Sequence, residues 1–199
     1  EHLIKKRGEV ITDRNIPEFK KIKKICLNKN LRLNDLDDKK NNFKILSHTF
    51  LEEAQLLKIK TKNSIKEIKI NLIGKIQLKN ILMAIIAAEK SNININKIIK
   101  VLPNLKSVEG RFEKIGEIKN QSRVIIDYAH TPDALKTCIL NLKEQFPDKK
   151  IILLFGCGGN RDQNKRSKMG KIADNLSHKI YLTDDNPRFE NPKKIRDDI

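Results

Sequence analysis

Three short polar clusters in the second half of the chain contain the residue types that bind charged ligands. They are 127–132, 156–162 and 183–188, and each of them follows a short apolar run. Ligands of open parallel α/β sheets bind outside the carboxyl ends of the strands. We therefore expect the three clusters to form one composite site. For any single cluster the alternative is an ordinary strand-to-helix loop, which is polar and uses Gly and Asn for its turns.

The second cluster is rich in glycine. Gly156, Gly158 and Gly159 allow close approach of the backbone, so their N–H groups are candidates for binding an anion. The spacing is not the dinucleotide-binding G-x-G-x-x-G motif, because Arg161 occupies the last glycine position. A phosphate-binding loop of the G-x-x-x-x-G-K-[ST] type does not occur in the sequence either.

Arg161 and Arg188 are the sharpest candidates for ligand binding. A guanidinium in a concave site presents a planar fork suited to a carboxylate or a phosphate. The alternative is that neighbouring carboxylates and amides only neutralise these arginines in a surface network. Asp127 ends a predicted strand and either caps the following helix or binds a ribose hydroxyl or a metal-linked phosphate. His130 by itself is more often a structural histidine than a functional one.

The elements that must position these clusters alternate regularly between strand and helix. Apolar runs predict strands over 123–126, 151–155 and 179–182. Thr131 with Pro132 is typical of a helix start, as is Asn191 with Pro192, and a further helix lies between them. Its apolar side carries Met169, Ile172, Ala173 and Leu176. This order predicts a parallel sheet with right-handed crossovers.

The first hundred residues are less informative. Strands are predicted over 44–49 and 65–72, and apolar residues at helical spacing predict a helix after Gly74, along 78–88. A short helix over 95–102 should end before Pro103. The stretch 103–110 contains Pro and Gly and interrupts the pattern, so we place a domain boundary there.

The net charge of +17, from 42 Lys and Arg against 25 Asp and Glu, raises the possibility of nucleic-acid binding. The basic residues are mostly lysines scattered among Ile and Asn, and aromatic residues make up only 5%. Single-strand binders use aromatic side chains to stack bases. A specific nucleic-acid partner is therefore not expected.

Several other classes are excluded by the pattern of the chain. It contains no apolar run long enough to span a membrane and no signal-peptide core at its start. The three cysteines form neither a C-x-x-C pair nor a short secreted framework, which favours a reducing, cytoplasmic setting.

Three motifs occur in the order DYAHTPDAL, FGCGGNRDQNKRSKMG and TDDNPRFENP. In this order and spacing they resemble the C-terminal domain of the Mur ligases, most closely the MurE family, which adds meso-diaminopimelate to UDP-N-acetylmuramoyl-L-alanyl-D-glutamate. VEGRFEKI at 108–115 resembles the hinge into that domain. LIGKIQLKNILMAIIAA at 72–88 is similar to the end of the family's central ATP-binding domain.

The resemblance implies an α/β fold in two parts. Residues 1–106 would be the C-terminal portion of the central ATP-binding α/β domain. Residues 107–199 would be the first half of a Rossmann-like, parallel-sheet C-terminal domain. The family's enzymes have three domains and at least about double this length. We therefore expect the chain to be a piece that lacks the UDP-substrate domain and the phosphate-binding loop, and that is inactive alone.

The resemblance also implies an ATP-dependent ligase of peptidoglycan synthesis, cytoplasmic and monomeric, that works through an acyl phosphate with Mg²⁺. Its substrates are UDP-MurNAc-dipeptide and meso-diaminopimelate. Positions that match the family's ATP contacts are Gln77, Asn80, Arg111, Asp127, Tyr128 and His130. Positions that match its diaminopimelate contacts are Arg161, Asp185, Asn186 and Arg188. Gln77 stands where the family usually has Asn. The metal ligands, including a carbamylated Lys, are not assigned within the chain.

Two alternatives remain at this point. One is another Mur-type or related ligase that adds an amino acid to a different acceptor. The other is a basic nucleic-acid-binding protein, whose polynucleotide binding would depend steeply on salt.

Overall fold

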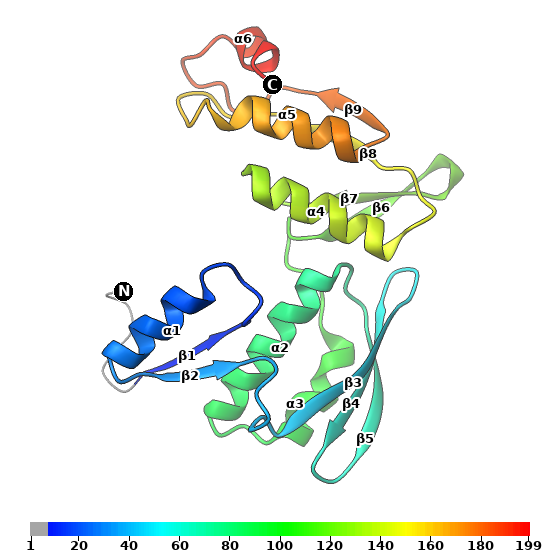
Figure 1. Cartoon of the computed structure of the whole chain (residues 1–199). Helices are drawn as coiled ribbons and strands as arrows, with labels where there is room; N and C mark the ends of the chain where they lie inside the picture. The colour runs from blue at the N-terminus through cyan, green and yellow to red at the C-terminus, as the bar shows by residue number, and fades with distance from the viewer. Residues whose placement is uncertain (1–7) are drawn as a thin grey trace. The chain divides into compact units, whose positions relative to one another are not determined.

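The computed structural model describes residues 8–199, which divide into two compact units, 8–106 and 107–199. Each unit is a mixture of helices and strands (Figure 1). The first unit contains β1 (Glu9–Thr12), α1 (Phe19–Asn28), β2 (Arg32–Asp35), β3 (Phe43–Phe50), β4 (Gln55–Thr61), β5 (Ile65–Ile70), α2 (Lys75–Lys90), α3 (Ile95–Val101) and a 3₁₀ turn, η1 (Leu102–Asn104). None of the helices in residues 8–199 is long and apolar enough to cross a membrane.

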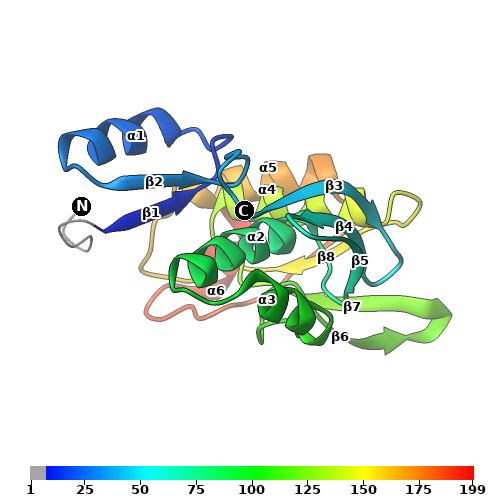
Figure 2. The ribbon, with the colours of Figure 1, turned by 90° about the horizontal axis from the view of Figure 1, so that it is seen from below.

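The first unit contains two separate sheets. β1 and β2 pair in parallel and are connected through α1, which lies alongside them (Figure 2). β3, β4 and β5 form an antiparallel sheet with β4 in the centre. The predicted strands over 44–49 and 65–72 are confirmed as β3 and β5, although β5 already ends at Ile70. The sequence analysis missed β4, β1 and β2.

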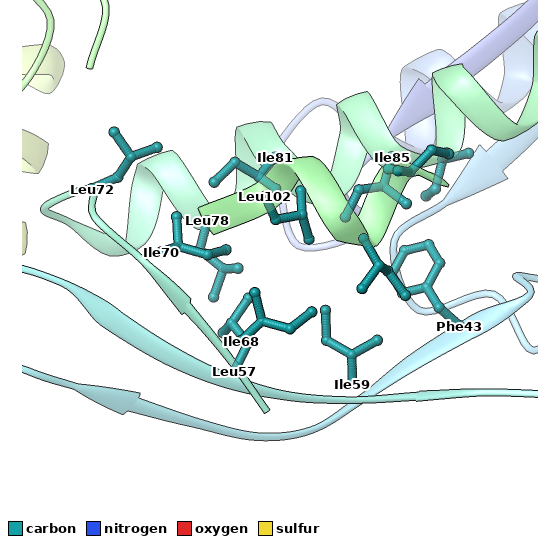
Figure 3. Close-up of a cluster of buried hydrophobic side chains, with 13 residues drawn as sticks. Phe43, Leu57, Ile59, Ile68, Ile70, Leu72, Leu78, Ile81, Ile85 and Leu102 are labelled. Carbon is teal, nitrogen blue, oxygen red and sulfur yellow. The ribbon is translucent and has the colours of Figure 1, made fainter. Parts of the chain in front are cut away.

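The core of the first unit lies between the antiparallel sheet and α2 (Figure 3). Inward-facing residues of β4 alternate with outward-facing ones, so Leu57 and Ile59 are completely buried. The predicted apolar face of α2 is confirmed. Of the five apolar residues at helical spacing, four are buried and the fifth, Leu82, is half-buried. Those four residues are Leu78, Ile81, Ile85 and Ile86.

The start of α2 is fixed by a glycine and a buried amide. Gly74 precedes the helix with a φ of 87°, a conformation that glycine adopts without strain. The side chain of Gln55, from β4, donates hydrogen bonds to the carbonyl oxygens of Leu72 (2.9 Å) and Gly74 (3.1 Å). The sheet thereby holds the first turn of the helix that carries Gln77 and Asn80. The following helix, α3, ends at Val101, and Pro103 lies within η1.

The second unit contains β6 (Glu113–Ile118), a 3₁₀ turn η2 (Lys119–Gln121), β7 (Ser122–Ile126), α4 (Pro132–Gln145), β8 (Ile152–Phe155), α5 (Lys165–Leu176), β9 (Lys179–Leu182) and α6 (Pro192–Asp197). The predicted strands and helices of this half are confirmed. Thr131 is the N-cap of α4, and its hydroxyl accepts a hydrogen bond from the Ala134 N–H at 3.2 Å. Asn191 caps α6 in the same way.

The sheet of the second unit differs in one respect from the expectation. β8 and β9 pair in parallel, as expected. β7, however, pairs antiparallel with β6, a strand that the sequence analysis missed, and among the described residues no ladder joins β7 to β8. A hairpin forms here because 3₁₀ turn η2, with Asn120 at a φ of 65°, reverses the chain directly between β6 and β7. The core consists of Leu135, Ile139, Cys157, Met169 and Ile195.

We predict that Leu57→Ala strongly destabilises the first unit, because Leu57 is fully buried in the central strand. Truncating a buried leucine costs about 2–5 kcal/mol in the free energy of unfolding. Leu27→Ala is the matched control, since 71% of that side chain is exposed and a change within about 0.5 kcal/mol is expected. Urea unfolding of both variants measures the difference. Equal stabilities for the two variants would contradict the described core.

Candidate functional site

Two of the three polar clusters lie in contact at the carboxyl ends of the parallel strands β8 and β9. The backbone N–H of Gly159 donates to the carbonyl oxygen of Asn186 at 2.8 Å. In return, the guanidinium of Arg188 donates to the carbonyl oxygen of Gly159 at 2.6 Å. A third hydrogen bond joins the N–H of Phe189 to the side-chain oxygen of Asn160 at 3.1 Å. The β8–α5 loop and the β9–α6 loop therefore form one surface.

Glycine permits this close approach. A Cβ atom built on Gly159 would lie 1.9 Å from the carbonyl oxygen of Pro187, which is far inside van der Waals contact. A Cβ on Gly156 would lie 2.2 Å from the carbonyl oxygen of Thr183. The sequence analysis assigned these glycines to anion binding. The structure shows a second reason for them, since they let one loop pack directly on the other.

A buried arginine lies beneath the two loops. Arg166, from the first turn of α5, is 1% exposed, and its guanidinium forms ion pairs with Glu190 (2.9 Å) and Asp198 (2.8 Å). Glu190 belongs to the β9–α6 loop, and Asp198 follows α6 directly. The sequence analysis missed Arg166 and Glu190. A signal was present, because Arg166 shares the helical face of Met169 and Ala173, where a charged residue requires partners.

Glu190 connects the loops on its other side as well. Its Oε1 atom accepts a hydrogen bond from the backbone N–H of Asn160, and its Oε2 atom accepts one from the side chain of Gln163 at 3.3 Å. The hydrogen bond from Asn160 and the neighbouring Arg166 lower the pKa of Glu190 below its ordinary value. Glu190 is therefore a carboxylate at neutral pH and remains an acceptor for both loops.

Arg188 lies on the outer surface of this junction, in an unusual backbone conformation. Its φ is 51°, and its N–H donates to the side-chain oxygen of Asn186 at 3.2 Å. Only one of its guanidinium nitrogens, NH1, donates to the described part of the chain. The NH2 and Nε groups remain available to a ligand. Asp185 lies nearby, because a Cβ on Gly158 would be 3.5 Å from its carboxylate and 3.0 Å from the Arg188 guanidinium.

The cluster after β7, residues 127–132, contacts the start of α5, and no hydrogen bond among residues 8–199 joins it directly to either of the other two clusters. Lys165, at the start of α5, donates from its ammonium group to the carbonyl oxygen of His130 at 2.7 Å. Asp127 is turned toward the chain before β6, and its Oδ2 atom accepts a hydrogen bond from the N–H of Phe112 at 3.0 Å. The cluster thus lies beside the start of α5. In addition, Asp127 holds the segment that carries Arg111.

The Tyr128 ring lies between two neighbours, with the guanidinium of Arg111 over it and the His130 ring edge-on to it. The guanidinium of Arg111 lies 4.6 Å from the centre of the Tyr128 ring, and the rings of Tyr128 and His130 are 5.3 Å apart at a steep angle. Tyr128 is 62% exposed. Flat, exposed groups of this kind offer a surface on which a planar base can stack.

Three further predicted site residues, Arg161, Gln77 and Asn80, take no part in the contacts described above. Arg161 is exposed and makes no hydrogen bond or ion pair with residues 8–199. Gln77 and Asn80 lie in the first two turns of α2, in the other unit, where Gln77 is half-buried and Asn80 is exposed.

The cysteines take no part in the site chemistry. All three are free thiols, in agreement with the sequence analysis. Burial, with a smaller contribution from Asp127, raises the pKa of Cys138 to about 12. Cys157 is buried against the sulfur of Met169 at 3.9 Å, and burial raises its pKa too. Both thiols are protonated at neutral pH, and Cys157 is part of the core of the second unit.

Comparisons with known proteins point to one family. Residues 110–199 match the family described as "Mur ligase, glutamate ligase domain". A UDP-N-acetylmuramoyl-L-alanyl-D-glutamate–2,6-diaminopimelate ligase of Rickettsia felis is 36% identical over 193 residues, which are 96% of this chain and 36% of that protein. The chain therefore spans about a third of the length of this relative.

Solved structures agree with the sequence comparison. A structure of a UDP-N-acetylmuramoyl-L-alanyl-D-glutamate–2,6-diaminopimelate ligase has 25% sequence identity and a TM-score of 0.59, over 96% of this chain and 39% of that one. A Mycobacterium tuberculosis folylpolyglutamate synthase complexed with ADP has a TM-score of 0.70 at 16% identity, over 91% of this chain and 40% of that one. The second likeness concerns the fold alone.

We predict that Gly159→Ala separates the β8–α5 and β9–α6 loops, because its methyl group would overlap the Pro187 carbonyl. The expected result is faster hydrogen exchange at the backbone of residues 158–160 and 186–190, with a lower melting temperature. Gly116→Ala is the matched control, since a Cβ there meets nothing within 4 Å. Unchanged exchange in Gly159→Ala would show that the loops are not packed as described.

Proposed function

Residues 110–199 of this chain belong to the Mur ligase, glutamate ligase domain family, and from this premise we propose that the chain is part of an ATP-dependent, C–N bond-forming ligase of peptidoglycan synthesis. The ligase adds meso-diaminopimelate to UDP-N-acetylmuramoyl-L-alanyl-D-glutamate. We call the longer protein that would contain this chain the parent protein. Its diaminopimelate-adding relative supports this length, because the chain spans 36% of it.

The division of the chain follows the same proposal. Residues 1–106 would be the C-terminal portion of the central, ATP-binding domain, and residues 107–199 the N-terminal portion of the C-terminal domain. The split between two compact units after residue 106 supports this proposal. We also propose that the parent protein is monomeric, acts in the cytoplasm and has no specific nucleic-acid partner.

The observation that supports diaminopimelate as the added amino acid is that only one nitrogen of the Arg188 guanidinium is hydrogen-bonded within residues 8–199. One nitrogen is held by the carbonyl oxygen of Gly159, whereas the other side makes no hydrogen bond within residues 8–199. Diaminopimelate differs from lysine by one terminal carboxylate, and a guanidinium fork is the group that distinguishes a carboxylate from its absence. Lysine would leave these donors without a carboxylate partner, so the site favours diaminopimelate.

We assign the remaining contacts of the amino acid to the same surface. Asn186 and Asp185 lie beside Arg188, so an amide and a carboxylate are available to the amino group and the carboxylates of diaminopimelate. Arg161 is exposed on the adjoining loop and is free of ion pairs with the described residues, so it can turn toward the substrate.

We assign the nucleotide contacts to the cluster 127–132, to Arg111 and to α2. Arg111, Tyr128 and His130 supply flat surfaces and positive charge, and Asp127 supplies a carboxylate for a ribose hydroxyl. Gln77 and Asn80 supply side-chain amides suited to the edge of adenine.

The proposed reaction has two steps. The side-chain carboxylate of the D-glutamyl residue first takes the γ-phosphoryl group of ATP, which releases ADP and gives an acyl phosphate. The amine of diaminopimelate then attacks the carbonyl carbon, loses a proton, and displaces phosphate as the amide forms. Phosphorylation supplies the leaving group that a carboxylate lacks. The residues of this chain contribute by holding both reactants in position.

Mg²⁺ is part of the proposal for the parent protein, with ligands outside the part of the chain described here. Within residues 8–199, no group of three or more His, Cys, Asp or Glu side chains is arranged to hold a metal ion. Carboxylate and other oxygen ligands are what Mg²⁺ requires. Two carboxylates of the second unit have partners within the chain: Asp127 accepts from a backbone N–H, and Glu190 accepts from a backbone N–H and from Arg166.

We predict that Arg188→Ala in the parent protein lowers kcat/KM for meso-diaminopimelate by about 100-fold, because each hydrogen bond to a charged group contributes about 1.5–3 kcal/mol. ATP binding should stay near the wild-type level, since within residues 8–199 Arg188 forms hydrogen bonds only with the β8–α5 loop and with its own loop. Steady-state kinetics and nucleotide titration measure both effects.

Arg196→Ala is the control for this experiment. Arg196 lies on α6 and pairs with Asp184 at the surface, so its loss should leave turnover close to wild type. Unchanged turnover of diaminopimelate by Arg188→Ala would overturn the assignment of the carboxylate contact. Tight, strongly salt-dependent binding of polynucleotides without any ligase activity would favour a nucleic-acid-binding protein instead.

A further inference from the structure

Arg166 is a charged residue in a position where an apolar side chain would be expected. It is 1% exposed and shares the inward face of α5 with Met169 and Ala173. Transferring a guanidinium out of water is costly, and replacing a buried ion pair by well-packed apolar residues is often neutral or stabilising. Packing alone therefore does not explain an arginine here.

The partners of Arg166 show what the charge accomplishes. One terminal nitrogen donates to Asp198 and the other donates to Glu190, so the guanidinium joins α5 to two places in the chain that lie 24 and 32 residues further along. The second nitrogen also reaches the carbonyl oxygen of Gly158 at 3.5 Å. Arg166 thereby forms hydrogen bonds with both the β8–α5 loop and the β9–α6 loop.

Glu190 passes this constraint to the surface of the site. It accepts hydrogen bonds from the backbone of Asn160 and the side chain of Gln163, which belong to the β8–α5 loop. Its own N–H donates to the carbonyl oxygen of Pro187 at 3.0 Å, which closes the turn containing Arg188. The position of the Arg188 guanidinium relative to Gly159 thus depends on Glu190, and that of Glu190 depends on Arg166.

We propose that Arg166 is a positioning residue for amino-acid binding: through Glu190 it holds Arg188 and the Gly158–Asn160 backbone in the arrangement that receives the distal carboxylate of the substrate. This inference rests on the proposed function of the site. Arg166 does not touch the substrate itself, because it is buried under the loops. The planar fork of arginine serves two carboxylates at once, which the single ammonium of lysine does less well.

The test compares Arg166→Met, Arg166→Lys and Lys168→Met in the parent protein. Lys168 lies on the same helix, is exposed, and loses the same charge in the control variant. Arg166→Met should raise the KM for meso-diaminopimelate by about tenfold or more, as expected when a distant change misplaces binding groups. The KM for ATP should not change, Arg166→Lys should recover part of the loss, and Lys168→Met should behave as wild type.

A merely structural role gives a different pattern. Partial unfolding would lower kcat through the active fraction and leave the KM for diaminopimelate unchanged, and that result would overturn the inference. If Arg166→Met does not fold, Arg166→Lys keeps the charge and decides the question. In that variant, hydrogen exchange of residues 158–163 and 186–190 should be faster than in wild type, and unchanged exchange would also overturn the inference.

The two proposals fail in distinguishable ways. If the wild-type parent protein does not ligate diaminopimelate, the proposed function is wrong, whereas the exchange experiment still shows whether Arg166 positions the loops. If the wild-type protein ligates diaminopimelate and Arg166→Met does so with an unchanged KM, only the role of Arg166 is wrong.

Discussion

The ion pairs of one buried guanidinium determine how the second unit presents its functional loops. A charge at the position of Arg166 is tolerated only with partners, because the cost of desolvation is otherwise uncompensated. Its partners Glu190 and Asp198 are distant in sequence, so satisfying the charge draws the β9–α6 loop and the end of α6 onto α5. Glycines on the β8–α5 loop then allow backbone to meet backbone without a steric clash.

The chemistry of the surface follows from this arrangement. Because Gly159 accepts only one edge of the Arg188 guanidinium, the other edge is left for a ligand. The cluster after β7 supplies two rings and a carboxylate, Arg111 lies against the Tyr128 ring, and Lys165 connects the cluster to the start of α5. We propose an acidic amino acid and a nucleotide as the ligands of these groups, and residues 110–199 match the Mur ligase, glutamate ligase domain family.

Much of the second unit could be predicted from the sequence, because local signals determine it. Thr131 with Pro132 and Asn191 with Pro192 mark helix starts by hydrogen bonds within a single turn, and apolar runs mark β8 and β9. The pairing of β7 with β6 could not be predicted, since β6 contains exposed residues and lacks a continuous apolar run. β4 was missed because its buried face alternates with lysines and includes the polar residues Gln55 and Thr61.

The candidate site was predictable in its outline only. Residue types placed Arg188, Asn186 and Asp127 in loops that follow strands. The structure brings the β9–α6 loop into contact with the β8–α5 loop, whereas Asp127 bonds to the segment before β6. The role of Arg166 beneath the loops could not be inferred from residue type alone, because an arginine in a lysine-rich chain resembles any other surface charge. Its role depends on Glu190, and pairs at such a separation are set by the tertiary fold.

The most direct test of this account is a double-mutant cycle between Arg166 and Glu190, measured by urea unfolding of the wild type, Arg166→Met, Glu190→Gln and the double variant. If the buried pair holds the loops together, the two substitutions are not additive, with a coupling free energy of about 1 kcal/mol or more. Additivity within about 0.3 kcal/mol would contradict it, because the two side chains would then contribute independently.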